Sequence, residues 1–249
     1  MKWLRTVGAW IAFAALILLG WQLLANHTEL VRLFLSSPVD LVRYARENSL
    51  SLLNAGVMTG LEALAGLSLA LLFATSAMIL ISINPGLLRF ILPPMILSQV
   101  IPLITIAPLL IVIIGIGVQS KIIMAAIISF FPIFINLAVS VRDIPTGFQE
   151  MTTLYRPNWL FKVRHLYLPL SLPSLMASLR VAATLSVIGA IVAEFTGAEI
   201  GLGKNLFLAM RRLEPELMMS SIILSALLGS GLYLAIVLVE RSVGRWYLR

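Results

Sequence analysis

The sequence contains no cysteine, only two histidines and few charged residues. The absence of cysteine excludes disulfide bonds, thiolate metal sites and a cysteine nucleophile. Charged residues make up 12% of the 249 positions, about half the usual share of a soluble domain. A chain of this length needs a polar shell to remain in water, so the shortage of charge argues against a soluble globular enzyme. The 60% apolar content excludes a disordered chain.

Long apolar stretches are what the sequence has in abundance, and its mean hydropathy is +1.01. A helix of about 20 apolar residues crosses the hydrocarbon core of a bilayer, so each such stretch predicts a membrane span. The stretches are continuous rather than alternating, which argues against barrel strands. We therefore predict an all-α integral membrane protein with a single domain over residues 1–249. Its predicted spans, about six, lie near 7–25, 57–83, 87–114, 122–141, 173–195 and 217–239.

The net charge of +7 is better explained by membrane topology than by nucleic-acid binding. If the N-terminus is cytoplasmic, the inward segments hold ten Lys and Arg against three Asp and Glu. The outward segments then hold seven Lys and Arg, including Lys121, against six Asp and Glu. The positive-inside rule thus predicts that both termini lie in the cytoplasm.

The third apolar stretch, 87–114, contains four prolines. Proline removes a helical hydrogen bond, and a carbonyl freed in lipid needs a partner inside a bundle or beside a water-filled path. A kinked packing helix and a helix that lines a pathway explain this pattern equally well. The candidate pathway residues are Gln99, Thr105, Asn136 and Glu194.

Three ionisable residues fall within the predicted spans, namely Glu62, Arg180 and Glu194. Charge in the bilayer core is costly, so these side chains should face protein or water, and we favour a structural partner slightly over substrate contact for each. Glu62 lies near one end of its span, from which a side chain can snorkel to the interface. Glu194 lies near the outer end of its span, and its alternatives are a place in the pathway and capping of the following loop.

The segment between the fourth and fifth spans, residues 142–172, has a pattern of its own. It predicts a helix over 146–155, a turn at 156–158 and a second, basic helix over 159–167, because Pro157 disfavours a helical Arg156. Aromatic and arginine side chains are typical of protein interfaces. The alternative is an interfacial helix lying on anionic lipid.

This segment resembles the EAA loop of ABC importer permeases. Glu150 matches the Glu of that motif, and Pro169 and Pro173 match its two prolines in type and spacing. Residues 151–152 replace two alanines of the motif, and Arg156 replaces its glycine. Arg does not readily adopt a positive φ, so we expect a helix-turn-helix whose turn is set by the proline that follows and differs from the family's.

The resemblance extends over 36–249, through the stretches 36–42, 98–136 and 179–206, and is to the nitrate, sulfonate, taurine and pyrimidine-precursor type of permease. It implies the type I ABC importer transmembrane fold and a homodimer in a bacterial cytoplasmic membrane. It also implies a cytoplasmic ATPase dimer that grips the loop and an extracytoplasmic binding protein that delivers substrate. The implied ATPase-coupling residues are Glu150, Thr152, Tyr155, Arg156, Pro157, Asn158, Trp159, Arg164 and Pro169.

Motifs for catalysis are missing from the sequence. The closest approach to a phosphate-binding loop, residues 198–205, lacks the first glycine and the final Ser or Thr of that motif. His27 and His165 lie far apart in sequence, so no metal site is predicted. We therefore expect a transport subunit rather than an enzyme, with no cofactor of its own and with ATP and Mg²⁺ on the partner ATPase. An ion-coupled secondary transporter is the alternative from another class.

The substrate is predicted only by resemblance. The segments 98–109 and 186–198 look more like permeases for vitamin-type heterocycles, such as thiamine pyrimidine precursors or riboflavin. A sulfonate, taurine or nitrate permease is the alternative.

Overall fold

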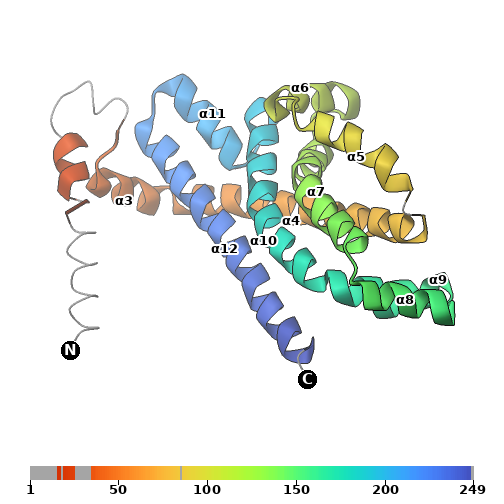
Figure 1. Ribbon diagram of the computed structural model, residues 1–249. Coiled ribbons are helices and arrows are strands. Elements are labelled where there is room, and N and C mark those ends of the chain that lie inside the picture. Colours follow the sequence, from red (N-terminus) through yellow and green to blue (C-terminus); the bar gives the residue numbers. More distant parts are fainter. Residues whose placement is uncertain (1–15, 18, 26–34, 85, 248–249) are drawn as a thin grey trace, which may run out of the picture.

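The computed structural model describes residues 16–17, 19–25, 35–84 and 86–247, and no strand occurs among them. The long helices α4, α7, α10 and α12 cross one another, and short helices lie at both ends of the bundle (Figure 1). The predicted first span, 7–25, falls mostly outside the described residues. The all-α membrane fold expected from the sequence is confirmed.

Four stretches of the described chain are long and apolar enough to cross a membrane. They are α4 (Ser49–Ile83), α7 (Val118–Arg142), the stretch Trp159–Gly197 that ends with α10 (Leu168–Gly197), and most of α12 (Pro215–Tyr247). Each contains one predicted span and extends beyond it at one or both ends. Hydropathy detects only the apolar part of a helix, and the polar turns that project from the membrane are invisible to it.

The predicted continuous third span is instead two helices, α5 (Leu87–Ser98) and α6 (Leu103–Ile114). The break falls at Pro102, whose backbone is extended with φ −60° and ψ 114°. Proline contributes no N–H to a helical ladder, so a helix readily restarts after it. The other prolines of this stretch lie inside α5 and α6. The four prolines thus predicted an irregular helix over 87–114, but not its division into the two helices α5 and α6.

The three central helices approach one another closely because small residues face the contact. Ala125 of α7 is fully buried. A Cβ added to Gly189 of α10 would lie 2.7 Å from the Cα of Ala125, and one added to Gly66 of α4 would collide with its side chain. Small residues let helix backbones meet in this way inside membranes. Larger buried side chains, including Phe134 and Met78, continue the core along the same helices.

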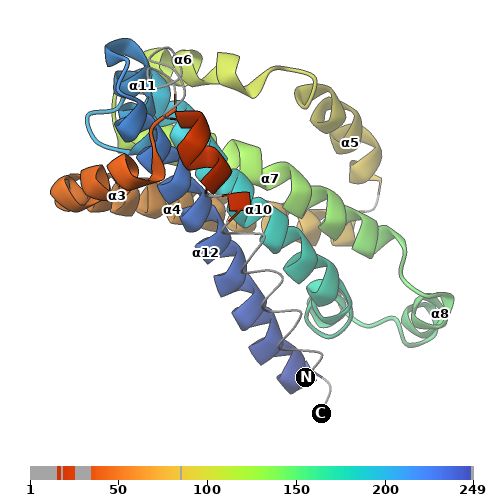
Figure 2. The same cartoon turned by 90° about the vertical axis from the view of Figure 1, so that its left-hand side faces the viewer.

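Short helices occupy the two ends of the bundle (Figures 1 and 2). One end carries α3 (Pro38–Glu47) and α11 (Leu202–Arg212). The other carries α8 (Thr146–Tyr155), α9 (Trp159–Lys162) and the π-helical turn η1 (Val163–Tyr167).

The two helices predicted for the loop 142–172 are confirmed, but the second does not end at the predicted entry to span five. α9, η1 and α10 form one uninterrupted helical stretch that includes Pro169 and Pro173. The wider turn η1 immediately precedes Pro169, where the backbone lacks a hydrogen-bond donor. The loop is therefore joined to the membrane by a continuous helix.

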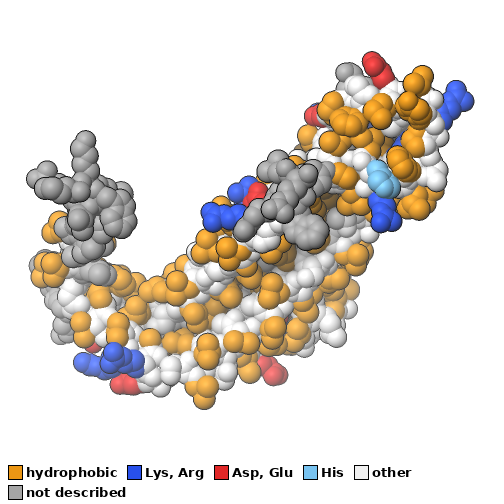
Figure 3. Space-filling view, turned by 90° about the horizontal axis from the view of Figure 1, so that it is seen from below, with side chains coloured by type: hydrophobic (Ala, Val, Ile, Leu, Met, Phe, Trp, Pro, Cys, Tyr) orange, Lys and Arg blue, Asp and Glu red, His pale blue; other side chains and the backbone are white. Residues whose placement is uncertain are grey.

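Hydrophobic side chains are spread over the whole described part of the molecular face seen from below, and few charged side chains are visible there (Figure 3). An apolar surface of this extent is typical of a protein surrounded by lipid or by partner subunits.

Candidate functional site

The tip of the loop 142–172 is a tight turn between α8 and α9. Arg156 ends α8 in the left-handed region, with φ 43° and ψ 50°. The expectation that Arg would avoid a positive φ is therefore wrong, because this residue adopts the conformation that glycine favours. Asn158 then begins the next helix, and its side-chain oxygen accepts a hydrogen bond of 2.8 Å from the N–H of Phe161. Such a cap satisfies one of the unpaired donors in the first helical turn.

Bulky side chains project outward around this turn. Leu154, Tyr155 and Trp159 are 78%, 74% and 54% exposed. Between α8 and the following helix lies a largely apolar hollow of about 650 Å³. The hollow is lined by Phe148, Met151, Thr152, Tyr155, Pro157, Asn158, Phe161, Lys162, His165 and Leu166. Exposed aromatic side chains beside a hollow are the features of an interface core that lacks its partner.

Four of the predicted coupling residues, Thr152, Tyr155, Pro157 and Asn158, line this hollow, and the others lie along α8 and the helical stretch that begins with α9. Exposed ones are Glu150, Tyr155, Arg156, Asn158, Trp159 and Arg164, and half-buried ones are Thr152, Pro157 and Pro169.

At the base of the loop, Arg142 Nε donates a hydrogen bond of 2.8 Å to Asp143 Oδ1. This hydrogen bond, together with the positive charge of the guanidinium, holds the pKa of the Asp143 carboxyl below its usual value. The pair lies at the C-terminal end of α7, where the loop 142–172 begins.

The candidate pathway residues are not gathered at one place. Gln99 follows α5 and lines an apolar cavity of about 430 Å³ between α4, α5 and α7. Thr105 and Asn136 are exposed, and their side chains donate to the carbonyls of Pro102 at 2.7 Å and Pro132 at 2.8 Å. Glu194 is fully buried. Of the four, one lines a cavity, two lie on the surface and one is enclosed by the bundle.

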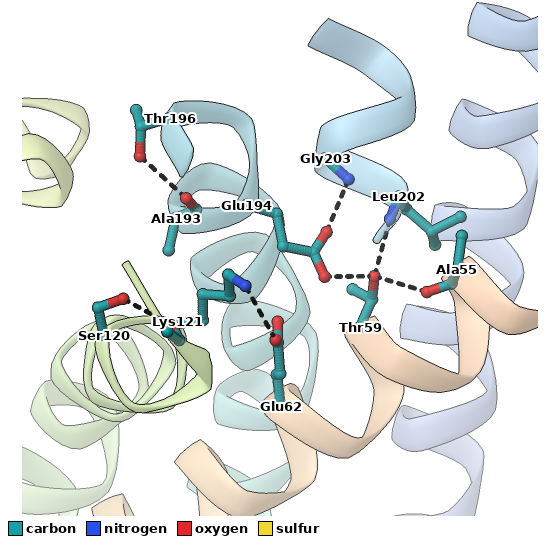
Figure 4. Close-up of polar contacts among 11 residues, drawn as sticks. Ala55, Thr59, Glu62, Ser120, Lys121, Ala193, Glu194, Thr196, Leu202 and Gly203 are labelled. Carbon is teal, nitrogen blue, oxygen red and sulfur yellow. Dashed lines mark hydrogen bonds and ion pairs between the residues drawn. The ribbon is translucent and has the colours of Figure 1, made fainter. Parts of the chain in front are cut away.

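Glu194 belongs to a buried polar network that joins α4, α10 and α11 (Figure 4). One carboxylate oxygen accepts from the N–H of Gly203 at 2.7 Å, and the other accepts from Thr59 Oγ1 at 2.6 Å. Thr59 Oγ1 in turn accepts from the N–H of Leu202 at 2.9 Å. Two roles were considered for Glu194 from the sequence, a place in the pathway and capping of the following loop. These hydrogen bonds are those of a cap on the start of α11.

A second buried pair lies beside this network (Figure 4). Glu62 Oε1 is 3.6 Å from Lys121 Nζ, and the two residues are 1% and 6% exposed. The snorkelling considered for Glu62 is therefore wrong, and so is the assignment of Lys121 to an outer loop. Lys121 lies in the first turn of α7, one position before the predicted span, where a hydropathy plot cannot separate a helix from a loop.

The third ionisable residue of the spans, Arg180, pairs with Glu240 of α12 at 3.4 Å. Each of the three charged residues found within the spans thus has a partner inside the chain, as favoured from the sequence. Sequence reasoning missed the partners, because Thr59, Lys121 and Glu240 are far from them along the chain. Within the described residues, no group of three or more His, Cys, Asp or Glu comes together to hold a metal ion.

Comparison with known proteins points to one family. Residues 66–246 match the family described as the inner membrane component of binding-protein-dependent transport systems. The riboflavin transport system permease protein RibX of Chloroflexus aurantiacus is 36% identical over 154 residues, which are 62% of this chain and 58% of that relative. The formylaminopyrimidine transport permease protein ThiX of Halalkalibacterium halodurans is 27% identical over 235 residues, 94% of each chain. A putative aliphatic sulfonates transport permease protein, SsuC of Escherichia coli, is 35% identical over 146 residues, 59% of this chain and 56% of the relative.

The family match covers most of the chain, from the middle of α4 into α12. It includes the loop 142–172, Glu194 and the start of α11, whereas Thr59 of the polar network lies before it. The apolar helices agree with a multi-pass protein of the inner membrane. The chain belongs to the inner membrane components of binding-protein-dependent transport systems and is the membrane-spanning permease subunit of an ABC importer.

Proposed function

We propose that the permease works as a homodimer whose loops 142–172 are gripped by a cytoplasmic ATPase dimer. The observation that carries this proposal is the exposed tip of α8 and α9, where Tyr155 and Trp159 project beside an unfilled hollow. Aromatic anchors of this kind dominate the energy of protein interfaces. Of the nine coupling residues named from the sequence, Thr152, Tyr155, Pro157 and Asn158 line the same hollow, which supports the proposal.

The chain itself is not an enzyme in this proposal, and ATP and Mg²⁺ bind to the partner ATPase. Closure of the two ATPase subunits moves the loops, and the continuous helical stretch Trp159–Gly197 carries the movement into the membrane. With 39 residues it is about 58 Å long at about 1.5 Å per residue. Rigid-body movement of such an element switches the pathway between inward-facing and outward-facing states.

The pathway lies between the two copies in this proposal. The broken helix α5–α6 supports it, because freed backbone groups inside a membrane belong beside protein or a water-filled path. Gln99, Thr105 and Asn136 are its candidate lining residues. The single domain spans 1–249, and both termini lie on the cytoplasmic side together with the ATPase.

A vitamin-type heterocycle is the proposed substrate class. Its support is the similarity to the riboflavin and formylaminopyrimidine permeases. A sulfonate-type permease is the second candidate, because the sulfonate relative from E. coli is 35% identical over its matched region.

Uptake into proteoliposomes that contain the permease, its ATPase and its binding protein tests the coupling proposal. Trp159→Ala is expected to reduce ATP-dependent uptake and co-purification of the ATPase by more than about tenfold. Leu50→Ala removes another exposed apolar side chain, at the opposite end of the bundle, and is expected to leave both unchanged. Uptake that survives ATP depletion and collapses with an ion gradient would instead identify a secondary transporter.

The ligand carried by the partner binding protein tests the substrate class. Mass spectrometry of the purified binding protein, followed by calorimetric titration, identifies that ligand. An aromatic or neutral heterocycle is the expected result. A sulfonate, nitrate or other small anion would contradict the proposal and favour the second candidate.

A further inference from the structure

α11 lies at the end of the bundle opposite to α8 and α9 (Figures 1 and 2). If the loop 142–172 faces the cytoplasmic ATPase, then α11 faces the extracytoplasmic side. This step rests on the proposed function. The same end of the molecule is the one that an extracytoplasmic binding protein can reach.

The surface of α11 carries an aromatic ring flanked by two cations. Lys204 Nζ is 5.7 Å and Arg211 Cζ is 5.5 Å from the ring centroid of Phe207. A cation held over a ring keeps a defined position and can still bind a carboxylate from another protein. Beside them, Met210 and Leu213 are 52% and 61% exposed. Positive charge mixed with exposed apolar side chains fits a partner surface that carries Asp and Glu around an apolar centre.

The start of α11 is anchored inside the bundle. Its N-cap residue is Gly201, which has no side chain to cap the free N–H groups of the first turn. Glu194 and Thr59 take that role from other helices, because they accept from the N–H groups of Gly203 and Leu202. A carboxylate at a helix N-terminus also interacts favourably with the helix dipole.

The two glycines at the start of α11 are closely packed against α10. A Cβ at Gly201 would collide with the carboxyl group of Glu194, and a Cβ at Gly203 would collide with the carbonyl oxygen of Ile191. Farther along the helix, Phe207 packs edge-to-face on Phe195 of α10, with centroids 5.5 Å apart. These contacts attach both the start and the middle of α11 to α10 and α4.

We propose that α11 is the surface on which acidic side chains of the extracytoplasmic binding protein dock, and that Glu194 and Thr59 are positioning residues that hold this helix for docking. A surface that is already ordered loses less entropy when a partner binds. Lys204 and Arg211 meet the partner directly, whereas Glu194 acts only through α11. The competing occupant of such a basic amphipathic helix is the anionic head-group layer of the membrane.

ATPase activity of the permease–ATPase complex in nanodiscs, titrated with substrate-loaded binding protein, tests the proposal. Reversing both cations, with Lys204→Glu and Arg211→Glu, is expected to raise the half-maximal binding-protein concentration about tenfold or more. The basal and maximal rates should stay unchanged. Added salt should weaken stimulation of the wild type more than that of the double variant. Arg212→Gln is the matched control, because Arg212 already pairs with Glu214 at 3.8 Å, and we expect a change below about twofold.

Glu194→Gln and Thr59→Val test the positioning role in the same titration. Both are expected to raise the half-maximal concentration while the maximal rate and ATPase co-purification stay unchanged. A lower maximal rate with an unchanged half-maximal concentration would overturn the positioning role and place these residues in the transport step. If either variant fails to fold, the surface variant of α11 still decides the docking proposal.

The wild-type complex separates failure of this inference from failure of the proposed function. If binding protein does not stimulate wild-type ATPase activity at all, the proposed function is wrong. If stimulation occurs and charge reversal on α11 leaves the half-maximal concentration unchanged, the docking surface is wrong. Charge reversal that changes only the response to anionic lipid in the nanodiscs would likewise overturn docking and assign α11 to the membrane surface.

Discussion

α8 and α11 are helices of 10 and 11 residues at opposite ends of the same bundle, but they are held in different ways. At the end of α8, Leu154 and Tyr155 are each more than 70% exposed. At the start of α11, Leu202 is fully buried, and the N–H groups of Leu202 and Gly203 donate into the network around Glu194. The end of α8 exposes apolar side chains, whereas the start of α11 buries the N–H groups of its first turn.

The difference lies in the range of the interactions that determine each end. The turn after α8 depends on neighbours in the sequence, namely the left-handed Arg156 and the Asn158 cap. The anchor of α11 depends on Thr59, which is 143 residues away from its partner Leu202. A locally determined hairpin can move as one piece, as the proposed coupling to an ATPase requires. An anchor formed by several helices fixes a surface relative to the membrane core.

The largest expected effect comes from breaking the buried ion pair beside the anchor. Lys121→Met leaves Glu62 as an unpaired buried charge and is expected to lower the free energy of unfolding by about 3–5 kcal/mol. Heat-induced loss of monodisperse protein in detergent measures the change. The double variant Glu62→Gln with Lys121→Met should recover much of the loss, because position 62 is then uncharged and the Glu194 carboxylate keeps its hydrogen bonds to Thr59 and Gly203. Equal loss in the single and double variants would contradict a buried pair.

A smaller loss is expected from a methyl group added at the start of α11. The Cβ of Gly203→Ala would collide with the carbonyl of Ile191, and we expect a cost of roughly 1–3 kcal/mol in thermal stability. Gly229→Ala on α12 is the control, since a Cβ there meets no atom within 4 Å. If Gly203→Ala and Gly229→Ala were equally stable, the start of α11 would not be as tightly packed as the structure indicates.

A substitution in the turn between α8 and α9 should destabilise the neighbouring residues without lowering the melting temperature of the whole bundle. Asn158→Ala removes the cap of α9 and is expected to lower the local opening free energy of residues 159–163 by about 1 kcal/mol. Hydrogen exchange of those amides measures it, while the melting temperature of the bundle stays unchanged. A fall in melting temperature as large as that of the Gly203 variant would show that the loop is not independent.

The smallest expected effect is a gain. Arg156→Gly relieves a non-glycine residue at φ 43° and is expected to stabilise the turn by about 0.5–1 kcal/mol. Slower hydrogen exchange around the turn would report the gain. Faster hydrogen exchange around the turn would contradict strain at position 156. Slower ATP-dependent uptake by the same variant would indicate that the arginine side chain contacts the ATPase.

Features with a local signal could be predicted from the sequence. The helices 146–155 and 159–167 and the turn between them were predicted, and the turn follows from Pro157, which disfavours a helical Arg156. The spans follow from apolar length alone. The left-handed Arg156 was not predictable, because its intrinsic preference opposes the conformation that the turn imposes on it.

Features that depend on distant partners could not be predicted. A structural partner was expected for Glu62 but could not be named, and Lys121 was counted in an outer segment; only the packing of α4 against α7 makes them a buried pair. Glu194 had two possible roles until Thr59 and the start of α11 were placed beside it. Inside the bundle, two side chains become partners because the helices that carry them pack together, and their separation along the sequence does not predict this packing.

The sequence by itself determined that this chain enters a membrane, which segments are apolar enough to cross it and where an aromatic loop projects. Burial of apolar length and local turn chemistry are properties that neighbouring residues share, so they can be read along the chain. Only the tertiary structure decided which charges neutralise one another and how α11 is held. Those outcomes depend on distances between helices, because a buried charge is stable only where a partner from another helix reaches it.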